Sequence, residues 1–401
     1  MARSSTPGST LPPPSPRRRR LGAGRVLRTV AVLAAAAVAV FYVGGGWYYA
    51  NEIRDGALVL APRTDPAPSG TVVEIDDAAV VLSMTAGATL PPGFQGIRDG
   101  DGYLQVGPIA GTATAEATAE IVEAWGPPPQ AGDPIAIDGF AYPDDPGTAF
   151  VYPFTEITYD SDIGAMDAWY LRGNSDLWMI FVHGRGASKA EALRMLPVAF
   201  DRSYHALVIG YRNDPGLPED PSGYTQYGLT EWIDVSNAAA YARANGADRI
   251  VVVGYSMGGA AVLRYLQESP LRNQTVAAIL DSPVVDLEAT IDHNARSREL
   301  PLLGTVPGSL TAVAKQLASW RFGIDWDRYD VTDRWQDLHT PMLVFHGTAD
   351  TSVPIGPTRR LANLRPDLVT LVETGADHVQ SWNLDPDGYR AAVEAFLDAN
   401  A

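Results

Sequence analysis

The second half of the chain alternates short, uninterrupted apolar runs with longer segments of helical periodicity, and this alternation restricts the fold more than any other feature. A strand covered on both faces reads as a continuous apolar run, and strands separated by helices join one parallel sheet through crossover connections. We therefore expect an α/β fold with a mostly parallel, doubly wound sheet. The expected strands are Leu177–Val182, Ala206–Ile209, Ile250–Val253, Val276–Leu280, Met342–Phe345 and Val369–Val372.

Helices are expected between these strands. Ser188 and Glu191 have the spacing of a capping box, which predicts a helix that begins at Ser188. Residues at about 283–337 interrupt the alternation with a helical pattern rich in Trp and Leu, and we expect them to form a lid over the sheet. The other expected helices are Glu231–Ala244, Gly258–Glu268 and Asp387–Ala399.

The N-terminal 50 residues have the composition of a membrane anchor. Residues 1–28 hold seven arginines and no acid in a Pro- and Ser-rich sequence, which predicts a disordered tail. Residues 29–50 carry no charge, and a helix of 22 residues at about 1.5 Å each spans a hydrocarbon core of about 30 Å. The arginines before this span predict a cytoplasmic N-terminus and a single pass through the cell membrane, with the remaining chain outside. A cleaved signal peptide, which would release a secreted protein, is the alternative.

Two further segments separate the anchor from the α/β pattern. Prolines and glycine break residues 51–70, which are expected to be a linker. Residues 71–145 are expected to be a small β-containing extension, and residues 146–401 form the α/β domain. The β-like runs of the extension are Thr71–Ile75, Ala79–Met84 and Tyr103–Val106.

The charge of the chain argues against one class of partner. Seven of the 30 Lys and Arg residues lie before Thr29, whereas all 47 Asp and Glu residues lie after Arg28, so the chain beyond the tail carries a formal charge of −24. Nucleic acid, which binds through neutralised phosphates, is therefore not an expected partner. The chain has no cysteine, which excludes a thiol nucleophile, a disulfide and a Cys-based zinc site.

Between an expected strand and an expected helix lies the sequence Gly254-x-Ser256-x-Gly258-Gly259. A serine on a tight, strained strand-to-helix turn needs small residues two positions before and after it, so that neighbouring backbone can pass closely. Its hydroxyl then stands exposed at the C-terminal edge of the sheet. We therefore expect Ser256 to be a nucleophile, with Gly254 and Gly258 as the glycines of its turn.

A serine nucleophile needs a histidine to take its proton and a carboxylate to orient that histidine. Among the six histidines, His378 lies in a loop after the last expected strand. Asp350 lies in a loop after the preceding strand and completes the chain order Ser, Asp, His. Asp281, which directly follows another strand, is the alternative acid. His346 is expected to be a strand-end residue and Asp377 a solvated neighbour of the base.

Attack on a carbonyl creates an oxyanion, which needs two preorganised N–H donors. The backbone N–H of Met257, directly after the nucleophile, is expected to be one donor. The second is expected from the loop after the first strand, where Arg185 donates through its main chain between Gly184 and Gly186. His183 is expected to brace this loop rather than to act as a base.

Four motifs follow one another in a familiar order. They are His183-Gly184-x-Gly186, Gly254-x-Ser256-x-Gly258-Gly259, His346-Gly347-x-x-Asp350-x-x-Val353-Pro354 and Gly375-x-x-His378. Over roughly residues 150–400 the chain resembles the α/β-hydrolase superfamily, in particular its bacterial serine peptidase, lysophospholipase and monoacylglycerol-lipase-like branch.

The resemblance implies a Ser-His-Asp hydrolase that needs no metal and no organic cofactor. It carries catalytic roles to Ser256, Asp350 and His378 and oxyanion roles to Arg185 and Met257. Relatives often have a small or apolar residue where this chain has Arg185. That departure leaves open either a positively charged pocket wall, which could bind a substrate carboxylate or phosphate, or a side chain that faces solvent.

These features together predict a membrane-anchored serine hydrolase that cleaves carboxylic esters of a small-molecule or lipid-like acyl substrate. A peptidase or aminopeptidase of the same fold, acting on peptides, and an acyltransferase use the same machinery and stay open as alternatives. Trp320, Phe322 and Trp326 in the lid suit an apolar acyl chain or only attach the lid to the core. A non-catalytic scaffold is disfavoured, because all three triad candidates are present.

Overall fold

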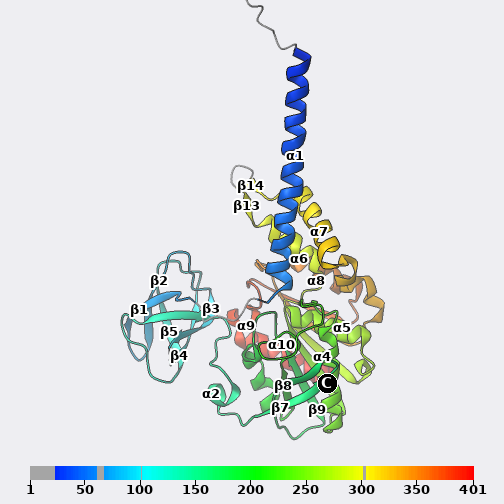
Figure 1. Ribbon diagram of the computed structural model, residues 1–401. Helices are drawn as coiled ribbons and strands as arrows, with labels where there is room; N and C mark the ends of the chain where they lie inside the picture. Colours follow the sequence, from blue (N-terminus) through cyan, green and yellow to red (C-terminus); the bar gives the residue numbers. More distant parts are fainter. Residues whose placement is uncertain (1–22, 61–66, 101, 301–303) are drawn as a thin grey trace, which may run out of the picture.

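The computed structural model describes residues 23–60, 67–100, 102–300 and 304–401. Three parts follow one another along the chain: a long N-terminal helix, a small β-barrel and an α/β domain (Figure 1). Most of the basic tail expected at residues 1–28, and part of the linker expected at residues 51–70, lie outside the described residues.

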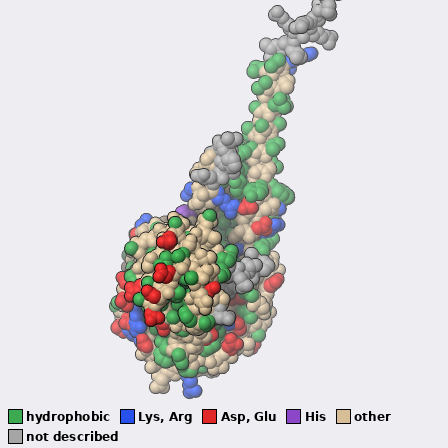
Figure 2. All heavy atoms as spheres, turned by 90° about the vertical axis from the view of Figure 1, so that its left-hand side faces the viewer, with side chains coloured by type: hydrophobic (Ala, Val, Ile, Leu, Met, Phe, Trp, Pro, Cys, Tyr) green, Lys and Arg blue, Asp and Glu red, His purple; other side chains and the backbone are tan. Residues whose placement is uncertain are grey.

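The N-terminal helix α1 (Ala23–Ile53) continues into a π-helical segment, η1 (Arg54–Leu58). This continuous helical segment therefore covers the whole span expected at residues 29–50 and also the first residues of the expected linker. It contains a stretch long and apolar enough to cross a membrane, and the most apolar part of that stretch is not buried against the rest of the chain. Apolar side chains cover this projecting part (Figure 2), among them Val30, Leu33, Val40 and Val43, each more than half exposed.

Six antiparallel strands form a closed barrel in the order β1-β2-β5-β4-β3-β6. Alternate side chains fill its interior, for example Val72, Leu82 and Leu104, whereas most of β5 is exposed. The sequence pattern located β1, β2 and β4 but gave no sign of the other three strands. The strands are β1 (Gly70–Ile75), β2 (Ala79–Met84), β3 (Gly93–Asp99), β4 (Gly102–Ile109), β5 (Glu116–Trp125) and β6 (Pro134–Asp138).

The α/β domain holds an eight-stranded sheet in the order β16-β15-β12-β11-β9-β10-β8-β7. Strands β9 to β16 of this sheet are parallel to one another, and the hairpin β7–β8 joins β10 in antiparallel orientation. The six parallel strands lie at the six predicted apolar runs. The bounds are β7 (Thr155–Ser161), β8 (Gly164–Leu171), β9 (Leu177–Val182), β10 (His205–Ile209), β11 (Arg249–Tyr255), β12 (Thr275–Asp281), β15 (Met342–Gly347) and β16 (Val369–Thr374).

Helices cover both faces of this sheet, as its doubly buried strands require. On β9, Ile180 and Val182 join the core beneath α4, α5 and α8, whereas Met179 and Phe181 join the core beneath α3 and α10. The helices and helical turns are α2 (Pro146–Phe150), η2 (Lys189–Arg194), α3 (Leu196–Asp201), α4 (Glu231–Ala244), α5 (Met257–Glu268), η3 (Arg272–Gln274), α8 (Ile355–Leu364), α9 (Ser381–Leu384) and α10 (Pro386–Asn400).

Residues 283–337, here called the cap segment, surround the lower part of α1 (Figure 1). Helix α7 lies alongside α1, and a Cβ at Gly46 would lie only 2.7 Å from Cγ1 of Val313. Ile53 of α1 is buried in one apolar cluster with Leu287 and Ala314 of the cap segment. The elements of the segment are α6 (Leu287–Arg296), β13 (Glu299–Leu300), β14 (Gly304–Thr305), α7 (Gly308–Phe322), η4 (Trp326–Tyr329) and η5 (Val331–Asp337).

Candidate active site

Ser256 lies on the tight turn between β11 and α5, with φ 49° and ψ −115°. A positive φ is costly for a side chain with a Cβ and is retained mainly where the surroundings fix it. The neighbouring glycines are required by contact. A Cβ at Gly258 would lie 2.2 Å from the carbonyl oxygen of Val182, and one at Gly254 would lie 2.8 Å from the carbonyl oxygen of Gly258. The turn therefore holds the Ser256 hydroxyl at the C-terminal edge of the sheet.

The structure brings together the three residues that the sequence pattern selected as a triad. Nε2 of His378 lies 2.9 Å from Oγ of Ser256, and Nδ1 of the same ring lies 2.8 Å from Oδ2 of Asp350. Because a carboxylate only accepts, Nδ1–H donates to Asp350, and Nε2 is left to accept from the serine hydroxyl. The ring is therefore held in the tautomer that can take a proton from Ser256.

Asp350 follows β15 in a loop that its own side chain fixes. Its Oδ1 accepts from the backbone N–H of Ser352 at 2.9 Å and of Val353 at 2.8 Å, and the residue is only 7% exposed. Burial raises the pKa of Asp350, but the hydrogen bond and charge of His378 and these N–H donors outweigh it, so the pKa is lowered. Asp350 is therefore ionised over the pH range in which His378 titrates.

The pKa of His378 is set by two opposing effects. Burial lowers it, and the hydrogen bond and negative charge of Asp350 raise it by more, so that the pKa lies above its usual value. The alternative acid, Asp281, ends β12 and is buried close enough to act on His378 through its charge. It is Asp350, however, that accepts the hydrogen bond from the ring.

The two predicted oxyanion donors are the backbone N–H groups of Met257 and Arg185. Met257 is the first residue of α5, so its N–H has no partner within the helix. Among the described residues, neither this N–H nor that of Arg185 has an intramolecular hydrogen-bond partner. The N–H of Gly184 is instead occupied by Oε2 of Glu191 at 2.7 Å. The remaining loop glycine, Gly186, has φ 68°, which a residue without a Cβ adopts at little cost.

Glu191 is also where the capping-box prediction is wrong. The Ser188 side chain caps nothing, and the segment that follows is the 3₁₀ turn η2 rather than an α-helix. The carboxylate of Glu191 turns toward the loop and binds Gly184, which competes with any bond to the N-cap. Glu191 is thus a residue of the site that the sequence pattern placed in a different role.

His183 braces the same loop, as expected from its position. Its Nδ1 lies 2.9 Å from the carbonyl oxygen of Gly184 and its Nε2 lies 2.9 Å from Oδ2 of Asp214. A ring that donates from both nitrogens is protonated. Consistent with this, burial lowers the pKa of His183, but Asp214 outweighs it and the pKa is raised. A charged, fully hydrogen-bonded imidazole is unsuited to act as a base.

Asp377 contributes more than the sequence pattern indicated. Its Oδ1 accepts from the backbone N–H of Thr351 at 2.8 Å and from the backbone N–H of His378 at 2.8 Å. The side chain therefore ties the loop of the acid to the loop of the base. Asp377 is an exposed neighbour of the base, as expected, but this link between the loops could not be seen from sequence because they are 26 positions apart.

A pocket of about 470 Å³ opens at Ser256 and His378. Apolar side chains from the cap segment, α1, η1 and the loop after β15 line much of it. They include Ile53, Ala57, Val284, Leu287, Ile291, Ala295, Ala314 and Val353. Trp320, Phe322 and Trp326 do not line this pocket, and Trp320 is 74% exposed. An acyl-binding role for these three aromatic residues is therefore not supported.

The Arg185 side chain also lines the pocket, but its guanidinium is engaged elsewhere. Nη2 donates to the carbonyl oxygen of Val59, just beyond η1, at 2.6 Å. The side chain thus links the loop after β9 to the end of the N-terminal helix and does not simply face solvent.

No group of three or more His, Asp or Glu suited to hold a metal ion occurs in the part of the chain that the structure describes.

A serine on a strand-to-helix turn, followed in chain order by an acid and a histidine at the C-terminal edge of a mostly parallel sheet, defines the α/β-hydrolase class. The chain belongs to the alpha/beta hydrolase family, whose model matches residues 179–392. This confirms the resemblance seen in the sequence motifs.

Two known proteins are similar to the chain. It is 23% identical over 271 residues to 2-(acetamidomethylene)succinate hydrolase of Mesorhizobium japonicum, with 59% of this chain and 94% of that protein covered. An esterase of Pyrococcus furiosus is 20% identical and has a TM-score of 0.51, with 65% of this chain and 97% of the esterase covered. A second crystal form of that esterase gives the same TM-score, with 62% and 92% covered. At this identity the structural likeness shows a shared fold.

Proposed function

We propose that this protein is a membrane-anchored serine hydrolase that cleaves carboxylic esters through Ser256, His378 and Asp350. The observation that carries the proposal is the unbroken hydrogen-bonded chain from the Ser256 hydroxyl through the imidazole to a buried carboxylate. Such a chain supplies the base that serine lacks at its own pKa. No cofactor enters the mechanism.

In the first half-reaction Oγ of Ser256 attacks the ester carbonyl as Nε2 of His378 takes the hydroxyl proton. The carbonyl oxygen becomes an oxyanion, which accepts from the backbone N–H groups of Met257 and Arg185. The C–O bond to the alcohol then breaks, and His378 gives the proton to the departing alkoxide. Water, activated by the same imidazole, hydrolyses the acyl-enzyme and restores Ser256.

An ester substrate is favoured over a peptide by the lining of the pocket. Its walls are mainly apolar, and Glu52 is the one acid that lines it among the described residues. Glu52 forms an ion pair with Arg298, so it is not available to bind the terminal amine of a peptide. The shared fold with an esterase agrees with this preference.

We propose residues 29–50 as the membrane span, with residues 1–28 in the cytoplasm and the catalytic domain outside. The absence of charge in the span and the exposure of its apolar side chains between Val30 and Val43 support this arrangement. Residues 71–145 serve as an extension that carries the barrel, and residues 283–337 serve as the lid, because α6 and α7 contribute walls to the pocket.

A fluorophosphonate probe tests the nucleophile directly. The probe should label the wild-type protein and not Ser256→Ala, because only an activated serine reacts. Ser83→Ala, which removes an exposed serine of β2, should be labelled like the wild type. Labelling that persists in Ser256→Ala would show that another residue is the nucleophile.

A further inference from the structure

The membrane helix itself forms part of the pocket that contains the nucleophile. Tyr49 and Ile53 of α1 and Ala57 of η1 line the pocket together with Ser256 and His378. Ile53 is 8% exposed and Ala57 is 7% exposed, so both are packed against the domain. A helix that served only as a tether would not need to enter the site.

Three successive backbone carbonyls hold the end of this helix on the domain. The hydroxyl of Tyr227 donates to Ala57 at 3.1 Å, and the N–H of Thr225 donates to Leu58 at 2.8 Å. The Arg185 guanidinium donates to the next carbonyl, that of Val59. Because Arg185 also carries a proposed oxyanion N–H, one residue contacts both the helix end and the reacting carbonyl.

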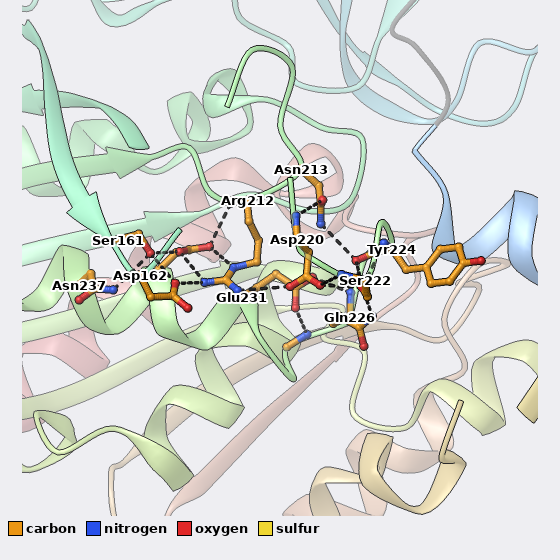
Figure 3. Close-up of polar contacts among 12 residues, drawn as sticks. Ser161, Asp162, Arg212, Asn213, Asp220, Ser222, Tyr224, Gln226, Glu231 and Asn237 are labelled. Carbon is orange, nitrogen blue, oxygen red and sulfur yellow. Dashed lines mark hydrogen bonds and ion pairs between the residues drawn. The ribbon is translucent and has the colours of Figure 1, made fainter. Parts of the chain in front are cut away.

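Partly buried polar contacts support Tyr224 and Gln226, the residues on either side of Thr225 in its loop (Figure 3). Glu231, which is fully buried, accepts from the N–H of Gln226 at 2.7 Å and of Gly228 at 2.8 Å. Deeper in the domain, the Arg212 guanidinium, 1% exposed, binds the carboxylates of Asp162, Asp220 and Asp234. A loop fixed by buried charge-assisted bonds presents a preformed seat for the helix end.

The cap segment fixes the opposite side of the helix. The Arg321 guanidinium lies 3.6 Å from the ring centre of Trp47 and donates to the side chain of Asn51 at 2.8 Å. At the next residue, Glu52 pairs with Arg298, and this pair lines the pocket with 34% and 49% of the two side chains exposed. The exposed pair marks the mouth of the pocket beside the end of the span.

We propose that the last turns of the membrane helix are a specificity-determining wall of the active site, and that the substrate is an amphiphilic ester held in the same membrane. The inference rests on the proposed esterase function. From Tyr49 to Ala57 the helix offers a wall about 12 Å long, which leads from the end of the span to the nucleophile. The acyl chain lies along Ile53, and the ester carbonyl reaches Ser256.

The absence of cysteine permits a clean test on the full chain in phospholipid vesicles. Ile53→Cys would be modified with a hexyl methanethiosulfonate, which extends the side chain into the pocket. The ratio of kcat/KM for p-nitrophenyl decanoate to that for the acetate should fall at least about tenfold, because a blocked apolar wall acts on the long chain. Asp55→Cys, on η1 beyond the proposed span, has an exposed side chain that does not line the pocket and should keep the wild-type ratio after modification.

A second measurement follows the rate of thiol modification and does not depend on substrate turnover. Reaction of Ser256 with a decyl fluorophosphonate should slow modification of the Ile53→Cys thiol at least about tenfold, since the bound decyl chain covers that wall. The Asp55→Cys thiol should react at one rate with or without the phosphonate. Equal rates at position 53, together with an unchanged substrate ratio, would overturn the proposed wall.

A separate experiment tests whether the substrate comes from the membrane that holds the enzyme. A fluorogenic ester on a non-exchanging lipid should be hydrolysed at least about tenfold faster in vesicles that hold the enzyme than in separate vesicles, because cis substrate is at high effective concentration. Equal rates would overturn this part. If the wild type hydrolyses no ester in any format, or if Ser256→Ala retains turnover, the proposed function itself has failed.

Discussion

At the residue scale, the carboxylates of Asp350 and Asp281 act on His378 in different ways. Asp350 accepts a hydrogen bond from the ring and is ionised. Asp281 is buried at the end of β12, and burial raises its pKa to about 7, although the charges of Arg194 and His378 oppose this. Both carboxylates raise the pKa of His378, but only Asp350 fixes the orientation of the ring. Orientation and electrostatics can therefore be separated by mutation.

Asp350→Asn should lower kcat by about 10⁴ while substrate binding is largely kept, because the ring loses its orienting acceptor and adopts the wrong tautomer. Asp281→Asn should leave kcat within about tenfold of the wild type, since it changes only a charge near the ring. Both variants are compared in one ester assay, and thermal melting checks folding. If the folded Asp281→Asn protein is inactive and Asp350→Asn is not, the acid has been assigned wrongly.

The pH profile provides a second residue-scale prediction. The base must be neutral to accept a proton, and the pKa of His378 is raised above its usual value of 6.5. The acidic limb of kcat/KM should therefore have its midpoint above pH 6.5, with activity lost as pH falls through it. In Asp281→Asn the midpoint should move to lower pH, because a negative charge that favours the imidazolium is gone. A midpoint that moves upward in this variant would contradict the electrostatic role of Asp281.

At the element scale, the sequence predicts those strands whose burial produces a regular apolar pattern, either continuous or alternating. β9 and β2 lie at their predicted bounds, because their residues are buried in a regular pattern. β5 and the hairpin β7–β8 were missed, since their mixed burial gives neither a continuous run nor strict alternation. The triad candidates could be selected from local motifs. The contact of Tyr227 with Ala57 could not, because 170 positions separate them.

The packing of α1 on α7 is closest at Gly46. A Cβ at Gly46 would lie 2.7 Å from Val313 and 3.2 Å from Leu317, whereas nothing lies within 4 Å of a Cβ at Gly44. Gly46→Leu should therefore lower the free energy of unfolding by about 1–3 kcal/mol through overpacking. Gly44→Leu should not lower it, because leucine fits a helix better than glycine does. Thermal melting of the full chain in nanodiscs compares the two, and equal melting temperatures would show that the helices do not pack closely here.

At the scale of the whole molecule, two attachments meet the catalytic domain near the triad. The helix end forms a wall of the pocket, and the barrel docks on α9, a few residues after His378. In that interface Gln95 donates to Gln380 at 3.1 Å, and Asn383 donates to the carbonyl oxygen of Phe94 at 2.6 Å. The N-terminal helix, the barrel and the candidate triad are therefore connected through short, hydrogen-bonded paths, so the proposed membrane position of the helix constrains the positions of the other two.

This arrangement bears on whether the N-terminal helix is retained. Cleavage near Ala50 would remove Tyr49 from the pocket and would expose the faces of Ala314 and Ala318 that pack in the cluster with Ala50. We therefore expect the protein made in cells to keep the helix and to remain with the membrane after carbonate extraction. The arginines before Thr29 further predict that protease added to intact cells digests the catalytic domain. Resistance of the domain to protease in intact cells would show the opposite orientation. A soluble protein whose N-terminal sequence begins near residue 50 would show a cleaved signal peptide instead.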